Sequence, residues 1–560
     1  MGMLSSIKNT LFLLLFSCLF WLLILPGART VGSVGDEAGT GTWGKYLING
    51  DDGYCLNSTY TLHFFSRDIK FPTNFVTPYM FSLAGYILVP VFYIFGLNIL
   101  AIKILGIFVS WMFLVFCFFL IEKHYGFFVA ALTVVMTAIS PVFVHASRFG
   151  MLHQEILINM FFLISVWLLH RYASSRNSAY LYAAALCGGL PLSIKLSAVA
   201  RYGAISVAIL LFFLEPLVKW IKKERKQRII FAVIFFAAGA GLLILYNIQT
   251  GGATFKLSAE TLTSYQEKGA GKVIGFVFQR FSQMLDIVTE NFYIYPVSHS
   301  LKPPNIFIIF QKTAFILVLI INLFISATAL NRKENKLLAA ILCVFFLMIV
   351  FSAVSPASLS EIHLYMIYPF PQFLTASLIF RIRNINKKIL IYCLLAAFFL
   401  LTYPFLLTRY LTVYNKRGGS MIGSPSTDIF IRYIKLIRAN PIYLLCDGVT
   451  LTSLLTFTTE DNDYRIDWNY SIHDYFLNNI PINKNEFGNF LQSEFKDKQR
   501  AFLIDNFITA YIYDLRNSRL LLEEILMEQG YSIKSVFLSR NYLGEPLFEL
   551  LEIRKTDNKG

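Results

Sequence analysis

The sequence predicts an α-helical, polytopic membrane protein with about eleven transmembrane helices and a small C-terminal α/β domain outside the membrane. Of its 560 residues, 56% are hydrophobic, 16% are aromatic and only 15% are charged. Soluble domains contain about 25% charged residues, so this composition indicates a membrane protein. Long apolar runs recur as far as residue 409, and a composition typical of soluble domains follows. The chain is therefore predicted to divide into a membrane domain, residues 1–410, and an outer domain, residues 411–560.

The charge differs between these two parts. Residues 411–560 contain 17 lysines and arginines against 19 aspartates and glutamates, whereas residues 1–410 contain 32 against 15. Cationic loops are expected on the cytoplasmic side of membrane proteins, so the basic balance indicates contact with membrane lipids and not with nucleic acid. The seven cysteines lack metal-ligand spacing. No metal site is predicted, and a requirement for a divalent cation is left open.

Each predicted span is an apolar run close to the roughly 20 residues that a helix needs to cross a bilayer. The first run follows Lys8 and is interpreted as an uncleaved span instead of a signal peptide. The shorter runs fit helices packed inside a bundle. The runs cover about 9–27, 98–121, 127–144, 155–170, 179–194, 198–215, 229–247, 304–330, 337–354, 363–380 and 389–409.

The topology follows from the short connections between the runs, which are basic and are therefore predicted to be cytoplasmic. They lie at 122–124, 171–176, 219–228, 332–336 and 381–388. All agree if the N-terminus is cytoplasmic and the first loop, 28–97, and the outer domain are extracytoplasmic. This requires the apolar run 78–96 to lie at the membrane interface. Pro78, Pro90 and Gly96 favour such a broken, shallow segment, whereas a crossing there would invert the first loop.

The outer domain shows the pattern of a small α/β fold. Residues 441–446 and 501–504 are apolar runs typical of buried strands, and a helical stretch from about 508 ends at Gly530. Residues 533–538 and 547–553 indicate two strands paired across a turn at Gly544-Glu545-Pro546. The sequence contains no Gly-rich phosphate fingerprint here, so the domain predicts no nucleotide site.

Two adjacent carboxylates, Asp36 and Glu37, follow the first span in a stretch that we expect to be a loop. From a loop both can turn toward one site, where one accepts a proton and the other holds a partner. The alternative is ordinary solvated surface. The residues from Ala38 to Gly50 do not by themselves distinguish a catalytic pair from solvated surface. The rest of the membrane domain is needed for that distinction.

Polar residues at the outer ends of the spans form a second group of candidates. Arg148, His153 and Glu155 lie on one connector, which is either a wall of the same site or an interfacial link with a snorkelling arginine. The lysines either anchor their spans or meet an anionic headgroup, and His363 is either functional or part of a capped helix start. The members are Lys103, Arg148, His153, Glu155, Lys195, His363 and Tyr365.

The order and spacing of these segments over residues 1–410 resemble the GT-C superfamily of polyprenyl-phosphate-dependent glycosyltransferases. Within it they are most similar to the branch of protein O-mannosyltransferases and lipid A aminoarabinose transferases. The matching segments are Asp36-Glu37-Ala38 to Asn49-Gly50, Pro78 to Gly96, Ala101 to Leu105, Pro141 to Glu155, Gly189 to Lys195, and His363-Leu364-Tyr365 to Tyr368-Pro369. The resemblance does not cover the outer domain.

The resemblance implies a multi-pass glycosyltransferase of a bacterial inner membrane. It would transfer a sugar from a polyprenyl-phosphate donor to a hydroxyl of a lipid, glycan or protein acceptor at the outer face. It places the catalytic acids on Asp36, which would be the general base, on Glu37 and on Glu155, where relatives more often have Asp. His153, His363 and Tyr365 would support the acceptor or the loops.

The resemblance also implies that Lys195, Arg148 and Lys103 contact the donor phosphate. The family begins its interfacial segment with Lys-Pro-Pro, but this chain has Thr77-Pro78-Tyr79, so the expected lysine is missing. Lys302-Pro303-Pro304 lies far downstream and is interpreted as an interfacial anchor. The absence of this lysine weakens the prediction of which donor is used more than the prediction of the class of enzyme.

Two other classes of function are weighed against the transferase. A lipid or polysaccharide transporter usually carries charged groups near the membrane midplane, and we expect none of the acids of the membrane domain to lie there. A non-catalytic membrane scaffold would not need Asp36. The outer domain is expected either to recognise the acceptor or to stabilise the fold.

Overall fold

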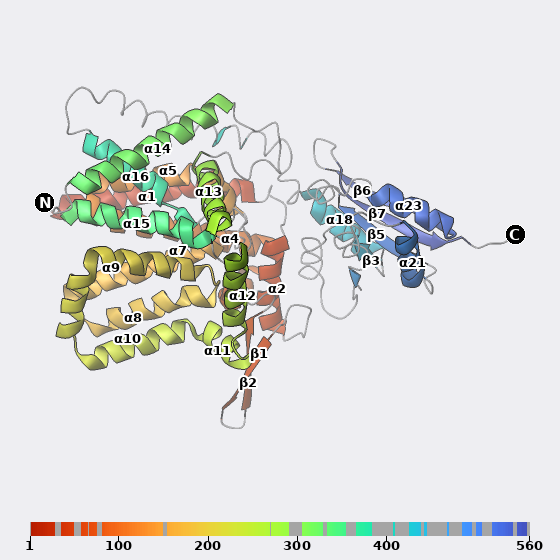
Figure 1. The fold of residues 1–560 in the computed structure, drawn as a ribbon, viewed down its shortest axis with the longest axis horizontal. Helices are drawn as coiled ribbons and strands as arrows, with labels where there is room; N and C mark the ends of the chain where they lie inside the picture. The colour runs from red at the N-terminus through yellow and green to blue at the C-terminus, as the bar shows by residue number, and fades with distance from the viewer. Residues whose placement is uncertain are drawn as a thin grey trace. The chain divides into compact units, whose positions relative to one another are not determined.

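The structure, a computed structural model, consists of two compact units (Figure 1). The membrane unit comprises Met1–Pro26, Trp43–Leu97 and Ala101–Tyr410, and the C-terminal unit comprises Gly27–Thr42, Asn98–Leu100 and Leu411–Gly560. The described residues are 2–28, 35–49, 58–64, 67–74, 81–148, 154–268, 270–289, 305–328, 333–353, 366–382, 407–408, 411, 425–437, 439, 442–444, 468–469, 484–495, 500–506, 518–540 and 546–556.

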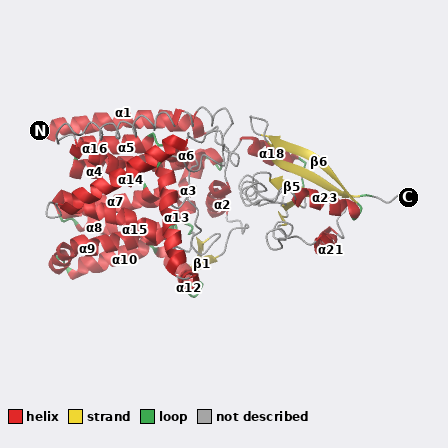
Figure 2. Cartoon of the chain, turned by 45° about the horizontal axis from the view of Figure 1, so that its top comes forward, coloured by secondary structure: helices red, strands yellow, loops and turns green. Residues whose placement is uncertain are grey.

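The membrane unit is almost entirely helical (Figure 2). The first helices are α1 (Gly2–Ala28), α2 (Gly35–Asn49), α3 (Leu83–Phe95), α4 (Ile99–Tyr125), α5 (Phe127–Ala138), α6 (Pro141–Arg148), α7 (Gln154–Ser175) and α8 (Ser178–Gly189). The first half of α2, as far as Thr42, and the first two residues of α4 belong to the C-terminal unit. After a 3-10 turn, Leu190–Ser193, follow α9 (Ala198–Lys223), α10 (Lys226–Gly239), α11 (Gly241–Gln249), α12 (Ala253–Lys268), α13 (Ala270–Val288), α14 (Asn305–Thr328), α15 (Lys333–Ala353) and α16 (Phe370–Ile382). A hairpin of β1 (Ser58–Phe64) and β2 (Arg67–Asn74) belongs to the predicted first loop.

The prediction of a polytopic helical membrane protein is confirmed, but the predicted number of about eleven continuous spans is not confirmed. Within the described residues, six helices are long and apolar enough to cross a bilayer, in α1, α4, α7, α9, α14 and α15. The predicted spans 127–144 and 229–247 are each broken into two helices, α5 with α6 and α10 with α11, bent by 65° and 68°. The run 179–194 forms only the 12-residue α8 before its 3-10 turn. The run 389–409 lies almost wholly outside the described residues.

Small residues allow helices α8 and α10 to pack in close contact. A Cβ on Gly189 would lie 2.9 Å from the Cα of Gly239, and a Cβ on Gly239 would lie 2.9 Å from the Cα of Gly189. Close approach of helix backbones at small residues is a common packing mode within membranes. In addition, Ser193 Oγ donates a hydrogen bond to the Gly239 carbonyl at 2.6 Å. The turn after α8 is therefore fixed against the break between α10 and α11.

Helix α2 corrects the expectation that Asp36 and Glu37 lie in a loop. Its four glycines make it a poor helix former by propensity, but its second half packs tightly on α3. A Cβ on Gly44 would lie 2.7 Å from the ring of Phe92, and one on Gly85 would lie 2.8 Å from the Cβ of Trp43. Tertiary packing thus favours this helix although its intrinsic propensity does not. In addition, acidic residues such as Asp36 and Glu37 are favourable in the first turn of a helix.

The run 78–96 contains one continuous helix, α3, and is not broken at Pro90 as we had expected. With 13 residues, α3 is about 20 Å long, shorter than the roughly 30 Å hydrocarbon core of a bilayer. Its last residues expose apolar side chains, with Tyr93 and Ile94 each 73% exposed. A length of about 20 Å fits a segment that does not cross the membrane by itself.

The C-terminal unit contains a mixed five-stranded sheet in the order β4-β3-β5-β7-β6. The strands are β3 (Ile442–Leu444), β4 (Trp468–Asn469), β5 (Arg500–Asn506), β6 (Tyr531–Arg540) and β7 (Pro546–Lys555), and the helices are α18 (Pro425–Leu436), α21 (Lys484–Phe495) and α23 (Ser518–Glu528). Strand β3 runs parallel to β4 and β5, whereas β7 runs antiparallel to β5 and β6. The predicted pairing of 533–538 with 547–553 is confirmed.

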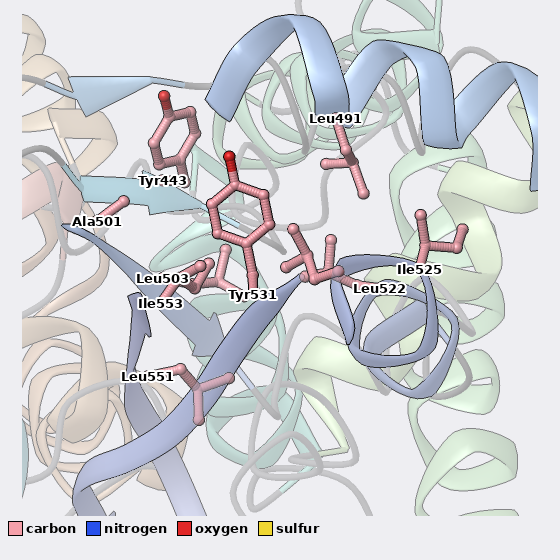
Figure 3. Close-up of a cluster of buried hydrophobic side chains, with 10 residues drawn as sticks. Tyr443, Leu491, Ala501, Leu503, Leu522, Ile525, Tyr531, Leu551 and Ile553 are labelled. Atoms are coloured by element: carbon pink, nitrogen blue, oxygen red, sulfur yellow. The ribbon is translucent and has the colours of Figure 1, made fainter. Parts of the chain in front are cut away.

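The core of this sheet forms where buried apolar side chains of its central strands meet two helices. Figure 3 shows Leu503, Leu551 and Ile553 meeting Leu522 of α23 and Leu491 of α21. Aromatic side chains add a second cluster, in which Phe430 of α18 stacks on Phe548 with ring centroids 5.4 Å apart. Residues of this unit thus have a hydrophobic core of their own, as the predicted α/β domain requires.

Candidate functional site

The centre of the candidate site in the membrane unit is Glu155, whose carboxylate is completely buried in the first turn of α7. Arg201 donates to Oε2 from Nη2 at 2.5 Å, and Lys195 Nζ lies 3.4 Å from Oε1. Ser197, the N-cap residue of α9, donates its hydroxyl to Oε1 at 2.9 Å, and its side chain makes no capping hydrogen bond with the helix backbone. One short stretch, from Lys195 to Arg201, therefore supplies these three donors.

Asn159 holds the second side of the Arg201 guanidinium. It lies one helical turn after Glu155, so both side chains are on the same face of α7, and its Oδ1 accepts from Arg201 Nε at 2.9 Å. Its Nδ2 donates to the carbonyls of Met366 and Tyr368, each at 3.2 Å. The buried charges are thus connected to the segment that begins α16.

Tyr368 extends this connection to the broken helix α5–α6. Its hydroxyl lies 3.1 Å from Oγ of Ser140, which sits at the bend. Ser140 Oγ also accepts from the backbone N–H of Phe143 at 3.3 Å, in the first turn of α6. Helix α6 ends at Arg148, so hydrogen bonds connect the surroundings of Glu155 to the helix that carries the second predicted phosphate ligand.

Arg148 is buried and does not snorkel to solvent. Its Nε donates to the carbonyl of Ile24 at 3.2 Å and its Nη2 donates to the carbonyl of Leu23 at 2.9 Å. These carbonyls lie near the C-terminus of α1, where the helix dipole attracts cations. Its Nη1 is buried and has no hydrogen-bond partner among the described residues. One face of this guanidinium is therefore still able to donate to an anion.

The backbone brings the start of the α3 segment to the turn that carries Lys195. The N–H of Phe81 donates to the carbonyl of Ile194 at 2.9 Å. This is the segment in which relatives have the Lys-Pro-Pro motif and this chain has Thr77-Pro78-Tyr79. Lys195, the residue after Ile194, is only 8% exposed. This buried cation therefore lies close to Phe81, in the segment that lacks the lysine expected from the resemblance.

Buried charge in the described membrane unit is predominantly positive. The buried cations are Lys103, Arg148, Lys195, Arg201 and Arg280, and the buried acid is Glu155. Lys103 lies near the start of α4 and is only 2% exposed. Charges in a low-dielectric interior interact strongly, so this arrangement favours an anionic ligand over a cationic one.

Several predicted site residues lie, wholly or with their side chains, outside the part of the chain that the structure describes. Asp36 and Glu37 lie in the first turn of α2, and their side chains are outside the described residues. His153, His363 and Tyr365 are outside them altogether. Among the residues that are described, no group of three His, Cys, Asp or Glu could hold a metal ion. The structure therefore brings together Glu155 and Lys195, and links Arg148 to them through hydrogen bonds.

Sequence reasoning missed Asn159, Ser197 and Arg201. A signal was present, because Glu155 and Asn159 are four residues apart on one helix, and Ser197 and Arg201 are four residues apart at the start of another. Such pairs lie on one face of each helix. Two polar pairs of the same spacing, each in an otherwise apolar segment, predict that the two faces meet.

Comparisons with known proteins agree with this fold. Residues 80–244 match the family model of dolichyl-phosphate-mannose-protein mannosyltransferases. Apo ArnT from Cupriavidus metallidurans is similar over 98% of both chains, with a TM-score of 0.55 and 11% identity. The same protein bound to undecaprenyl phosphate matches over 96% of this chain and 97% of its own, with a TM-score of 0.52 and 12% identity.

The apo oligosaccharyltransferase of Archaeoglobus fulgidus is similar over 89% of this chain and 69% of its own, with a TM-score of 0.51 and 11% identity. No curated protein sequence matches the chain significantly. The resemblance predicted from the sequence is thereby confirmed at the level of the superfamily. The family match over residues 80–244 supports this resemblance, and the fold shared over nearly the whole chain is that of the GT-C glycosyltransferases.

Proposed function

We propose that this protein transfers a sugar from a polyprenyl-phosphate-linked donor to a hydroxyl group of a lipid, glycan or protein acceptor at the outer face of a bacterial inner membrane. The observation that carries the proposal is the buried, predominantly cationic site around Lys195, Arg201 and Glu155, connected through hydrogen bonds to Arg148. The Nη1 of Arg148 is buried and has no hydrogen-bond partner among the described residues. A buried charge needs a partner, and a donor phosphate at the membrane surface would provide one to this guanidinium.

The comparisons support the chemical class of the donor. ArnT, which shares this fold, has been solved with undecaprenyl phosphate bound. The family model that matches residues 80–244 describes enzymes that use dolichyl-phosphate-mannose. Both ligands are long-chain polyprenyl phosphates, so a phosphate joined to a lipid chain is the common feature that we carry over to this protein.

The proposed reaction is a single displacement at the anomeric carbon of the sugar. The acceptor oxygen forms a bond to that carbon while the bond from the carbon to the phosphate oxygen breaks, and its electron pair leaves with the polyprenyl phosphate. Asp36 takes the proton of the acceptor hydroxyl as general base, with Glu37 beside it. One inverted anomeric centre results from a single displacement.

Cations, and not a general acid, assist the leaving group in this scheme. A phosphate ester oxygen leaves as a stable anion, so the site needs positive charge aimed at the oxygen on which negative charge develops. We assign that role to Lys195 and Arg148, with Lys103 as a third cation. His153, His363 and Tyr365 are assigned to support of the acceptor or of the outer loops.

The C-terminal domain, residues 411–560, is proposed to recognise the acceptor, because the residues that the chemistry needs lie outside it in the sequence. Truncation after Arg409 should leave slow hydrolysis of the donor while transfer to the acceptor falls. If hydrolysis and donor binding both disappear from a folded truncated protein, the domain is required for the fold of the site and does not serve only the acceptor.

An assay in proteoliposomes tests the proposed function and separates it from the alternatives. The purified protein is supplied with polyprenyl-phosphate sugars, and released polyprenyl phosphate is measured by mass spectrometry. We expect release with the wild type and a loss of about 10²–10⁴-fold with Asp36→Asn, at unchanged binding of undecaprenyl phosphate. Glu215→Gln, which removes a carboxylate that is 77% exposed on α9, is the matched control and should be fully active.

Each other outcome identifies a different function. Transport of the intact donor across the bilayer without cleavage of its sugar–phosphate bond would indicate a lipid transporter. Neither cleavage nor transport, in a protein that also fails to bind undecaprenyl phosphate, would indicate a scaffold. Release by purified Asp36→Asn at the wild-type rate would refute the role of Asp36 as general base.

A further inference from the structure

Gln154, the first residue of α7, carries a buried amide oxygen that nothing in the described chain satisfies. The residue is only 4% exposed, and its Oε1 has no hydrogen-bond partner among the described residues. Its face of α7 also carries Leu157 and Ile158, which are buried and whose side chains offer no donor. A buried acceptor without a donor costs free energy, so a donor supplied by a ligand would be favourable here.

The preceding helix ends on the complementary group. Arg148, the last residue of α6, is 2% exposed, and its Nη1 has no acceptor within the described part of the chain. Gln154 follows Arg148 by six residues, so one short connector is flanked by an unfilled donor and an unfilled acceptor. The two groups are not hydrogen-bonded to each other. A ligand that fills both needs an anionic part for Arg148 and a hydrogen-bond donor for Gln154.

The charges nearby decide which kind of donor fits Gln154. Glu155, the next residue, already pairs with Arg201 and Lys195, and the buried charges of the described membrane unit are predominantly positive. An ammonium group on a ligand would be repelled by these cations, whereas a neutral hydroxyl would not. The ligand therefore combines an anion with hydroxyl groups, and a sugar joined to a phosphate is such a molecule.

We propose that Gln154 recognises the sugar of the polyprenyl-phosphate donor, with its Oε1 accepting a hydrogen bond from one sugar hydroxyl while Arg148 donates to the phosphate. This inference rests on the proposed function and deepens it, because it assigns a residue that distinguishes a sugar-loaded lipid from the bare lipid phosphate. The acceptor's hydroxyl is the competing ligand. The donor sugar is favoured because it is joined directly to the phosphate assigned to Arg148 and Lys195, and Lys195 Nζ lies 3.4 Å from the carboxylate next to Gln154.

Binding to the full-length protein in detergent tests the proposal with Gln154→Met, which keeps the length of the side chain and removes its amide. The probes are undecaprenyl phosphate and the same lipid phosphate carrying glucose, mannose or arabinose. The wild type should bind at least one loaded lipid more tightly than the bare one. In Gln154→Met that loaded lipid should bind about three- to tenfold more weakly, the effect of one hydrogen bond, while the bare lipid binds as before.

The thermal unfolding midpoint of the ligand-free protein provides a second readout. Replacing a buried group that has no partner should leave the midpoint unchanged or raise it, whereas loss of a structural hydrogen bond would lower it. Gln227→Met is the matched control, because Gln227 is exposed in the first turn of α10; it should change neither binding nor melting. Gln154→Leu is the second variant if Gln154→Met fails to fold, and failure of both would show that the amide is structural and overturn the proposal.

Deoxy analogues of the most tightly bound sugar then form a double-mutant cycle with Gln154→Met. The analogue that lacks the recognised hydroxyl should bind the wild type and the variant about equally, because neither complex can form the hydrogen bond. The other deoxy analogues should still bind the wild type about three- to tenfold more tightly than the variant. If every analogue shows the same difference between wild type and variant, the contact to a sugar hydroxyl is refuted.

The remaining outcomes separate this inference from the proposed function. Equal loss of affinity for bare and loaded lipid in Gln154→Met would show that the amide serves the phosphate, and would overturn the inference. Unchanged donor binding and donor hydrolysis with reduced transfer would assign Gln154 to the acceptor, and would also overturn it. A wild type that binds undecaprenyl phosphate but no loaded form more tightly leaves the phosphate site in place and removes the role of Gln154. Absence of undecaprenyl phosphate binding by the wild type would instead overturn the proposed donor, and the inference with it.

Discussion

Gly189 of α8 and Gly239 of α10 pack backbone against backbone, and a Cβ on either would lie 2.9 Å from the Cα of the other. The Cβ of an alanine at 189 would also overlap the carbonyl oxygen of Phe236. Backbone atoms cannot move aside as a flexible side chain can, so α8 and α10 would have to separate. We therefore predict that Gly189→Ala lowers stability by about 1–3 kcal/mol or more.

The thermal unfolding midpoint in detergent checks this prediction, with Gly275→Ala as control. Gly275 is also within a helix, α13, but an added Cβ there would meet no heavy atom within 4 Å. Its replacement should be neutral or stabilising by about 0.5–1 kcal/mol, as expected from helix propensity alone. Equal midpoints for Gly189→Ala and the wild type would contradict the close packing of α8 on α10.

Arg148 connects helix α6 to the C-terminal end of α1 through hydrogen bonds. We predict that replacing it, even by lysine, destabilises the protein. Lysine carries one ammonium group and cannot reproduce the fork that reaches the carbonyls of both Leu23 and Ile24. Arg148→Lys should cost about 1–3 kcal/mol and also weaken binding of undecaprenyl phosphate. Arg225→Lys, at an exposed position, should change neither quantity. Unaltered melting and binding in Arg148→Lys would argue against both roles.

The turn between α9 and α10 provides a pH-dependent test. Glu224, at the C-terminal cap of α9, accepts hydrogen bonds from the hydroxyl of Tyr172 and from Arg228, the latter at 3.1 Å. The bond from Tyr172, and then those from Arg225 N–H and Arg228, lower the pKa of Glu224 below its usual value of 4.5. Because the folded pKa is lowered, the stabilisation is complete above about pH 4.5 and is lost as the pH falls through the folded pKa.

Tyr172→Phe should therefore melt below the wild type at pH 7, since a hydrogen bond to a charged group stabilises by about 1.5–3 kcal/mol. The difference should shrink as the pH falls below 4.5 and Glu224 takes up a proton. Tyr180→Phe removes a hydroxyl of the next helix, α8, for which no hydrogen bond with described residues is seen, and it should have no such effect. A difference that persists unchanged at acid pH would show that Tyr172 stabilises through packing alone.

The predicted topology places the two ends of the chain on opposite sides of the membrane. Reporter fusions after Lys8, Gly50 and Gly560 measure this directly. We expect a cytoplasmic signal at Lys8 and extracytoplasmic signals at Gly50 and Gly560, because the basic connections agree on one side. A cytoplasmic signal at Gly50 would mean that the α3 segment crosses the membrane, and it would exclude an outer-face role for Asp36.

Much of the architecture could be predicted because it depends on local pattern. The apolar runs gave most of the helices, and the apolar stretches 533–538 and 547–553 on either side of a turn gave strands β6 and β7. Helix α2 could not be predicted in this way, because its four glycines oppose a helix and packing of its second half, at Trp43 and Gly44, against α3 makes the helix favourable. The bends at Ser140 and Ala240 were missed for a related reason: hydropathy measures the length of an apolar run and not its direction.

The candidate site was predictable in part. Glu155 and Lys195 were singled out from a resemblance, and the structure places their charged groups 3.4 Å apart. Arg201 was overlooked because an arginine near the start of an apolar run looks like an anchor in the headgroup region, yet its side chain is 2% exposed and paired with Glu155. Burial of a charge depends on the partner that another segment supplies, and a single sequence does not show which segments meet.

Binding of undecaprenyl phosphate to Lys195→Ala, measured beside Lys302→Ala, is the most direct test of the proposed donor site. Lys195 lies in the buried cationic site, whereas Lys302 matches no motif of the family and is interpreted as a surface anchor. We predict that Lys195→Ala binds about tenfold more weakly or worse, and that Lys302→Ala binds as the wild type does. Equal, mild effects of the two substitutions in folded proteins would contradict the assignment of the cationic site to the donor phosphate.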